Sequence, residues 1–170
     1  MITAYFSTNK ISSTSNDAFS LYEKSRFGEK KQNKVEYSLV ETLFLLEKNK
    51  LHLLQNKKQL SFDDLIKKAK RIDKRIEIKY PVFEKLRARG YILKTALKFG
   101  ADFRVYKKGI KPGQDHALWI LFCVKESQTN SWHDFAAKNR VAHSTKKKLL
   151  IGIVDDEDDV TFYEIRWLKP

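Results

Sequence analysis

In the first half of the chain, apolar residues recur every three or four positions behind polar residues that can begin a helix. Ser38 with Glu41, and further along Ser61 with Asp64, have the spacing of residues that cap a helix N-terminus. The apolar residues behind each start fall on one helical face: Leu39, Leu43 and Leu46 after the first, and Phe62, Leu65, Ala69 and Ile72 after the second. A weaker helical spacing runs from Asp17 to Ser25. The pattern therefore predicts two capped helices and a third, less clearly marked one.

Shorter apolar segments predict strands between these helices. They are Ile2–Phe6, which precedes a polar Ser/Thr stretch, and Leu51–Leu54, which is followed by a turn at 56–59. From Ile76 to Tyr80, apolar and charged residues alternate with the period of a strand. We expect this alternation to end a first structural unit.

The sequence changes character near Ile78. Pro81 suits the first turn of a new helix and Gly90 suits its end, so we expect a short helix from Pro81 to Arg89. Runs of β-branched and aromatic residues then predict further strands, with a helix from 131 to 145 before the last two. The predicted strands are Tyr91–Lys94, Phe103–Tyr106, Ala117–Val124, Leu149–Val154 and Val160–Trp167.

These patterns predict an α+β protein with two domains. Residues 1–77 form an N-terminal structural domain of helices with a small sheet. Residues 78–170 form a C-terminal domain, whose mixed β-sheet is flanked by helices and has one helix connecting its central strands.

The charge of the chain narrows the choice of partners. Lys and Arg number 34 against 21 Asp and Glu, and the net charge of +13 favours a polyanion such as nucleic acid, although a lysine-rich surface alone would give the same count. Cys123 is the single cysteine, so an internal disulfide is impossible and a reducing compartment is indicated. No apolar stretch approaches the roughly 18 residues that cross a bilayer, and the start lacks the apolar region of a signal peptide. We expect a soluble, cytoplasmic protein without membrane contact.

The common motifs of metal and nucleotide chemistry are missing. None of the histidines, which are His52, His116, His133 and His143, stands at a zinc-ligand spacing from another ligand residue. The sequence also lacks a glycine-rich phosphate loop and the serine-hydrolase motif. We therefore expect neither a metal ion nor a cofactor.

One acidic run is open to three interpretations, and it consists of Asp155, Asp156, Glu157, Asp158 and Asp159. As a metal site it lacks the glycine and the terminal glutamate that a calcium-binding loop requires. It also fits a solvated hairpin turn between two strands. On a chain of charge +13, it further suits an oligomer contact that enters a basic groove of another subunit.

Three segments of the C-terminal half closely resemble the archaeal tRNA-splicing endonuclease family. They are Lys98–Tyr106, with the sequence KFGADFRVY, Asp115–Ala117, with the sequence DHA, and Arg140–Leu150, with the sequence RVAHSTKKKLL. Weaker similarity in YSLVETL at 37–43 and LSFDDL at 60–65 extends the resemblance over nearly the whole chain. The resemblance implies a catalytic C-terminal domain with a Tyr, His and Lys triad. It also implies a tetramer, either of four copies or of this chain with a structural subunit.

The resemblance assigns the triad to Tyr106, His116 and Lys147. Lys147 is the middle one of three consecutive lysines, so Lys146 and Lys148 are the alternatives. The family holds a base that flips out of the RNA between two flat or cationic side chains, which here match Arg140 and Trp167. Trp167 replaces the second arginine of other members, and an indole still stacks well on a base.

These residue types suit RNA cleavage by the neighbouring 2′-hydroxyl. That reaction needs a base for the 2′-hydroxyl, an acid for the leaving 5′-oxygen and positive charge at the phosphate. Histidine can hold and release a proton near neutral pH, which suits His116 as the acid, and Lys147 supplies charge. A tyrosine is ordinarily protonated at neutral pH, so Tyr106 needs cationic neighbours such as Lys107 and Lys108 to act as the base. Alternatively, Tyr106 orients the 2′-hydroxyl.

The resemblance implies a precursor tRNA substrate that is cut at bulge–helix–bulge elements, leaving 2′,3′-cyclic phosphate and 5′-hydroxyl ends. Two other functions stay open at this point. One is a metal-dependent nuclease that uses the acidic residues at 155–159, and the other is an RNA-binding structural subunit without chemistry.

Overall fold

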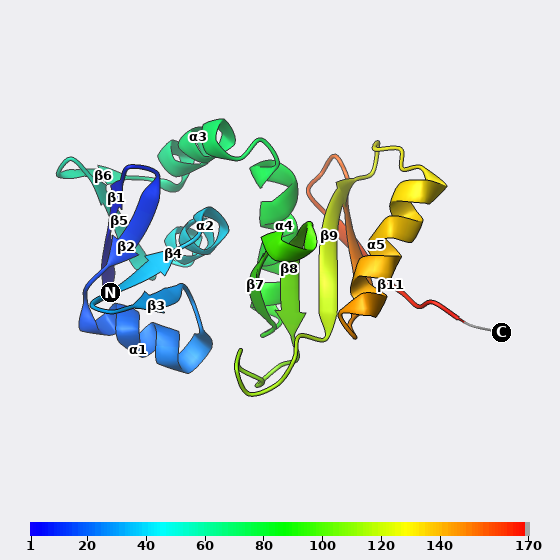
Figure 1. Ribbon diagram of the computed structural model, residues 1–170. Helices are drawn as coiled ribbons and strands as arrows, with labels where there is room; N and C mark the ends of the chain where they lie inside the picture. The colour runs from blue at the N-terminus through cyan, green and yellow to red at the C-terminus, as the bar shows by residue number, and fades with distance from the viewer. Residues whose placement is uncertain (169–170) are drawn as a thin grey trace. The chain divides into compact units, whose positions relative to one another are not determined.

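The computed structural model describes residues 1–168 and is an α+β protein, as the sequence predicts (Figure 1). The chain divides into two compact units, Met1–Tyr80 and a second unit that begins at Pro81. Each unit has its own β-sheet. Within residues 1–168, no helix combines the length and the apolar character that crossing a membrane requires.

The first unit contains a six-stranded sheet, larger than the small sheet expected, with the order β3-β4-β2-β1-β5-β6. Its strands are β1 (Ile2–Ser7), β2 (Lys10–Ser13), β3 (Glu29–Lys31), β4 (Lys34–Tyr37), β5 (Leu51–Gln55) and β6 (Lys58–Leu60). β1 and β5 are parallel, and the other neighbours are antiparallel. The sequence pattern does not predict β2, β3, β4 and β6, because these strands are short and mostly polar.

Three helices belong to this unit: α1 (Asn16–Ser25), α2 (Leu39–Glu47) and α3 (Phe62–Ile72). Both predicted N-terminal caps are present, and each of them is a capping box. The Ser38 hydroxyl accepts the N–H of Glu41, and the Glu41 carboxylate accepts the N–H of Ser38. Ser61 and Asp64 make the same pair of bonds at the start of α3. The bonds satisfy backbone donors that a helix start otherwise leaves unpaired.

The segment from Ile76 to Tyr80 is helical, so the predicted strand is wrong. α4 spans Ile76–Ala88 and has Pro81 in its interior, so the prediction of Pro81 in the first turn is also wrong. Residues four apart share a helical face, so the apolar pattern that suggested a strand also places Ile76 and Tyr80 on one side of a helix. The division between the two units falls inside α4, between Tyr80 and Pro81.

Polar contacts ahead of α4 explain its early start. The Asp73 carboxylate accepts the backbone N–H of Arg75 at 2.9 Å and pairs with the Lys79 ammonium at 2.7 Å. Val82 and Phe83 are buried, so packing holds the helix at the position where proline removes one of its backbone bonds.

The second unit contains a five-stranded mixed sheet with the order β11-β10-β9-β8-β7. Its strands are β7 (Ile92–Ala96), β8 (Ala101–Tyr106), β9 (Trp119–Lys125), β10 (Lys148–Val154) and β11 (Val160–Ile165), with a short 3-10 helix, η1 (Leu97–Phe99), between β7 and β8. β9 and β10 are parallel neighbours, and α5 (Trp132–Ser144) connects them. This confirms the prediction of one helix between the central strands.

Helices cover both faces of this sheet. On one face, α4 lies so close to β10 that a Cβ added to Gly152 would be 3.0 Å from a methyl group of Val82, and Phe83 packs on Phe103 with 5.8 Å between the ring centroids. On the other face, Ala142 of α5 belongs to a buried cluster with Ile120 and Leu149. The sheet and its two helices therefore form a rigid support for the residues at its margin.

Candidate active site

Tyr106 is fixed at the end of β8. It is only 5% exposed, and it packs with Ile92 of β7 and with Ala117 in a small buried cluster. A loop leaves β8 after Tyr106 and returns beside it, because the N–H of Leu118 donates to the carbonyl oxygen of Val105 at 2.8 Å. The tyrosine thus lies at the base of the loop formed by residues 107–118.

His116 lies on this loop, which backbone contacts hold in shape. The N–H of Gln114 donates to the carbonyl of Lys111, whose own N–H donates to the Gln114 side chain at 2.9 Å. Pro112 and Asp115 form an isolated bridge, and the Asp115 carboxylate accepts the backbone N–H of His116 at 2.6 Å. The imidazole itself is exposed, so it is positioned through its backbone and stays accessible.

The end of α5 positions Lys147. The N–H of Lys146 donates to the carbonyl of His143, and the N–H of Lys147 donates to the carbonyl of Ala142 at 2.9 Å. Lys146 has a φ of 56°, which is the left-handed conformation of a helix C-terminus with this bonding pattern. The chain then reverses into β10 at Lys148.

The three consecutive lysines have different surroundings. The Lys147 ammonium donates to the carbonyl of Thr145 at 2.8 Å and lies 5.6 Å from the centroid of the Phe99 ring. Lys146 is exposed, and Lys148 pairs with Glu164 at 3.2 Å. Lys147 is thus the only one of the three held beside an aromatic ring in the part of the chain that the structure describes.

Glu164 compensates the charge of Lys148. Hydrogen bonds from Trp119, Lys148 and Arg166 hold the pKa of the Glu164 carboxyl below its ordinary value, although slight burial opposes this. The carboxylate therefore stays negative to lower pH than usual, and it neutralises the positive charge of Lys148.

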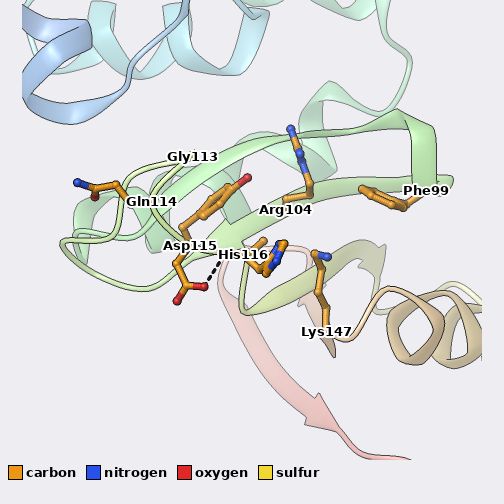
Figure 2. A pocket seen from close by; sticks show the side chains of 9 residues that line it. Phe99, Arg104, Gly113, Gln114, Asp115, His116 and Lys147 are labelled. Carbon is orange, nitrogen blue, oxygen red and sulfur yellow. Dashed lines mark hydrogen bonds between the residues drawn. The ribbon is translucent and has the colours of Figure 1, made fainter.

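Tyr106, His116 and Lys147 line one pocket of about 460 Å³ (Figure 2). They come from three separate segments, namely the end of β8, the loop 107–118 and the entry to β10. Residues that are distant in the sequence are thereby brought to one site. The remaining lining residues are Phe99, Arg104, Gly113, Gln114, Asp115 and Ala117.

Two of these lining side chains, Phe99 and Arg104, are functional candidates that the sequence reasoning missed. Arg104 stands two residues before Tyr106 on a strand, so alternation alone places both side chains on one face of the sheet. That signal was present in the sequence. The contact between Phe99 and Lys147 had no such signal, because it depends on how η1 and the end of α5 meet.

A second pocket of about 260 Å³ adjoins the first and shares Lys147 with it. Trp167 lines this pocket, and its ring stands nearly perpendicular to that of His143 with 4.3 Å between the centroids. Arg140 is exposed on α5, three residues before His143, and does not line either of these two pockets. The structure therefore brings Trp167 to the site beside His143, and leaves Arg140 one turn away along the helix.

The acidic run forms the tight turn between β10 and β11. The Asp155 carboxylate accepts the backbone N–H groups of Glu157 and Asp159, each at 2.9 Å. Asp159 pairs with Lys85 at 2.7 Å, which lowers the pKa of the Asp159 carboxyl, and Asp156 pairs with Lys125 at 3.2 Å. Within residues 1–168, no three His, Cys, Asp or Glu side chains are grouped so as to hold a metal ion.

The pocket can perform acid–base chemistry on an anion. It presents an accessible imidazole that can transfer a proton, an ammonium group that can stabilise negative charge, and a phenol held by the core. The pocket lining thus includes groups that can transfer protons and groups that can bind anions, together with the Asp115 carboxylate.

Two family models match this chain. The one described as tRNA intron endonuclease, catalytic C-terminal domain, matches residues 76–162. The one described as tRNA intron endonuclease, N-terminal domain, matches residues 2–66. The first match includes the three pocket residues Tyr106, His116 and Lys147.

Several archaeal proteins named tRNA-splicing endonuclease are similar to the chain over most of its length. The protein from Pyrococcus abyssi is 39% identical over 170 residues, which cover 99% of this chain and 98% of that protein. The protein from Nanoarchaeum equitans is 45% identical over 141 residues, which cover 79% and 90%, respectively. The protein from Methanothermobacter thermautotrophicus is 37% identical over 150 residues, which cover 88% and 87%.

Proposed function

This chain belongs to the tRNA intron endonuclease family, and we propose that it excises introns from precursor tRNA by cutting at bulge–helix–bulge elements. The observation that carries the proposal is the single pocket lined by Tyr106, His116 and Lys147. The archaeal proteins named tRNA-splicing endonuclease, which match this chain over nearly its full length, support the choice of substrate. Residues 1–77 are the proposed structural domain, and residues 78–170 are the proposed nuclease domain.

In the proposed reaction, the 2′-hydroxyl at the cut site attacks the adjacent phosphorus. The bond from phosphorus to the 5′-oxygen breaks, giving a 2′,3′-cyclic phosphate and a 5′-hydroxyl end. His116 donates a proton to the departing 5′-oxygen, and the Lys147 ammonium stabilises the negative charge on the phosphate. Tyr106 accepts the proton of the 2′-hydroxyl or orients that group. The exposure of His116 and the fixed position of Tyr106 suit these roles.

Base binding is proposed at the second pocket, beside Lys147. A base that flips out of the RNA would lie between Arg140 and Trp167, with the indole on one face and the guanidinium on the other. The half-exposed Trp167 ring and the position of Arg140 one turn from His143 support this arrangement. His143 contacts Trp167 directly, so it would have to shift or join the stack when a base binds.

Assembly into a tetramer is proposed through the acidic turn at 155–159. Precursor tRNA has two cut sites, and a tetramer could present two active sites to them, either as four copies of this chain or with a structural subunit. Glu157 and Asp158 are exposed at the tip of the turn, which leaves them accessible to a basic surface of a neighbouring subunit.

The proposed reaction class is tested by cleavage of a bulge–helix–bulge RNA in excess EDTA. We expect cleavage to proceed, to leave a 2′,3′-cyclic phosphate, and to stop when the cut-site nucleotide is 2′-deoxy. A 2′-deoxy nucleotide elsewhere in the same RNA is the matched control and should be cut normally. A requirement for a divalent ion, or normal cleavage of the cut-site 2′-deoxy RNA, would contradict the proposal.

A further inference from the structure

Arg104 lines the same pocket as the three proposed catalytic residues, and the reaction described above gives it no role. It lies two residues before Tyr106 on β8, so both side chains project from the same face of the sheet. Lys94 of β7 stands opposite it across the antiparallel ladder, and Ile120 of β9 stands opposite on the other side. Arg104 is therefore a rigidly placed cation at the wall of the pocket.

The guanidinium of Arg104 is anchored at one edge. Its Nε–H donates to the carbonyl of Thr95 at 3.2 Å. Within residues 1–168, the structure gives its two Nη groups no hydrogen-bond partner and no carboxylate to pair with. An arginine with a fixed Nε and two available Nη groups presents parallel N–H donors, which is the geometry that binds two oxygens of one phosphate.

Arg104 and Lys147 occupy different parts of the pocket. In Figure 2 the Arg104 side chain extends from β8 with its guanidinium pointing away from His116 and Lys147. Lys147 is instead held beside Phe99 by its bond to Thr145. If Lys147 and His116 act on the phosphate that is cut, the Arg104 guanidinium is placed for a different negative charge along the same RNA strand.

We propose that Arg104 binds a phosphate adjacent to the one that is cut, and so sets the register of the RNA backbone in the pocket. This inference rests on the proposed function, because it requires an RNA strand that crosses the pocket. The alternative role of Arg104 is purely structural, in which its contact with Thr95 only stabilises the pairing of β7 and β8. The two roles differ in whether substitution changes RNA binding at one specific phosphate.

The test combines a protein variant with single neutral linkages in the RNA. An uncut RNA with a 2′-deoxy cut site carries one methylphosphonate at a time, at the cut phosphate and at the two phosphates on either side of it. Dissociation constants are measured for the wild type, for Arg104→Gln and for Lys98→Gln. Lys98 is an exposed lysine outside the pocket, so its variant is the matched control for loss of one charge.

We expect Arg104→Gln to bind the unmodified RNA roughly 10- to 100-fold more weakly, as the loss of a charge-assisted pair of bonds implies. One methylphosphonate adjacent to the cut should weaken the wild type similarly and leave the binding of Arg104→Gln unchanged. Lys98→Gln should respond to every methylphosphonate as the wild type does. Equal losses for wild type and Arg104→Gln at all positions would overturn the proposal, as would wild-type affinity of Arg104→Gln.

Two further measurements keep the result interpretable. Urea unfolding of Arg104→Gln detects a purely structural role, and if this variant does not fold, Arg104→Lys replaces it. Arg104→Lys keeps the charge and loses the paired donors, so it should lose affinity at the same single phosphate, and no such loss would overturn the inference. Cleavage by the wild type is scored separately. A wild type that binds RNA without cutting it contradicts the proposed function, while the phosphate test of Arg104 still gives its answer.

Discussion

Lys147 differs from its two lysine neighbours in what its side chain and backbone contact. Its ammonium lies beside the Phe99 ring in the pocket, while Lys146 provides the left-handed residue that ends α5 and Lys148 pairs with Glu164 on the adjacent strand. The three consecutive lysines therefore have different local environments, although their side chains are chemically identical.

This difference predicts the outcome of single alanine substitutions in the three lysines. Lys147→Ala should lower the single-turnover cleavage rate by about 10² to 10³, the usual effect of losing one group that stabilises charge in a transition state. Lys146→Ala is its matched control and should change the rate little, because the Lys146 side chain is exposed and lines neither pocket. Lys148→Ala should lose less than Lys147→Ala, because Lys148 lines only the second pocket. A larger loss for either neighbour than for Lys147→Ala would show that the wrong lysine has been assigned.

The resemblance to family motifs pointed to Tyr106, His116 and Lys147 as the triad, but it did not indicate the other residues that line the pocket. Tyr106, His116 and Lys147 lie in segments that resemble a known family, so their positions could be matched without a structure. Phe99 and Asp115 contribute through contacts of η1 and of the loop 107–118, and those contacts depend on tertiary packing. Motif spacing alone therefore left Lys146 and Lys148 as alternatives.

At the scale of elements, Asp73 connects the end of α3 to the start of α4. Burial opposes ionisation of its carboxyl, but hydrogen bonds from Lys79 and the Arg75 backbone outweigh it and lower the pKa of Asp73. A carboxyl with a lowered pKa stabilises the folded state at every pH above its unfolded value, which is about 3.9. That contribution is lost as the pH falls through the lower, folded value.

Asp73→Asn should therefore destabilise the protein in a pH-dependent way. We expect a loss of roughly 0.5 kcal/mol in unfolding free energy at pH 7, typical of a partly exposed ion pair, and a smaller loss at pH 3. Urea unfolding at both pH values measures it, and Lys79→Gln completes a double-mutant cycle. A loss that is equal at pH 7 and pH 3 would mean that the charge of Asp73 does not matter.

The segment from Ile76 to Tyr80, which the sequence pattern predicted as a strand, is part of the helix α4. Ile76, Ile78 and Tyr80 alternate over only five positions, a length at which strand and helix periods are hard to separate. The Asp73 contacts at the start of α4 are side-chain hydrogen bonds across a turn, which the apolar pattern does not reveal. Pro81 is typical of a first helical turn, so the helix was predicted to begin there although it begins at Ile76. Longer patterns with a clear cap, such as α2, α3 and α5, were predicted to within a residue or two.

At the scale of the whole molecule, the acidic turn is where this positively charged chain concentrates negative charge. Asp155 holds the turn together, Asp159 pairs with Lys85, and Asp158 has a φ of 63° that suits aspartate better than lysine. Glu157 can therefore be changed with the least effect on the turn itself, and a change of Asp156 removes only its exposed ion pair with Lys125.

Reversal of these two charges tests the proposed assembly. The double variant Asp156→Lys and Glu157→Lys should dissociate the tetramer, because an attractive contact with a basic surface becomes repulsive. Light scattering gives the mass, and reversal of the exposed Glu29 and Asp63 in the first unit is the control of equal charge change. A tetramer mass unchanged by the double variant would refute the contact.

In the proposed reaction, His116 is the acid that protonates the leaving 5′-oxygen. The most direct measurement compares wild type and His116→Ala on two RNAs, one normal and one whose leaving 5′-oxygen is replaced by sulfur. A thiolate leaves without protonation, so we expect His116→Ala to lose about 10² to 10⁴ in rate on the normal RNA and far less on the sulfur RNA. An equal loss on both RNAs would contradict this role, because His116 would then act somewhere other than at the leaving group.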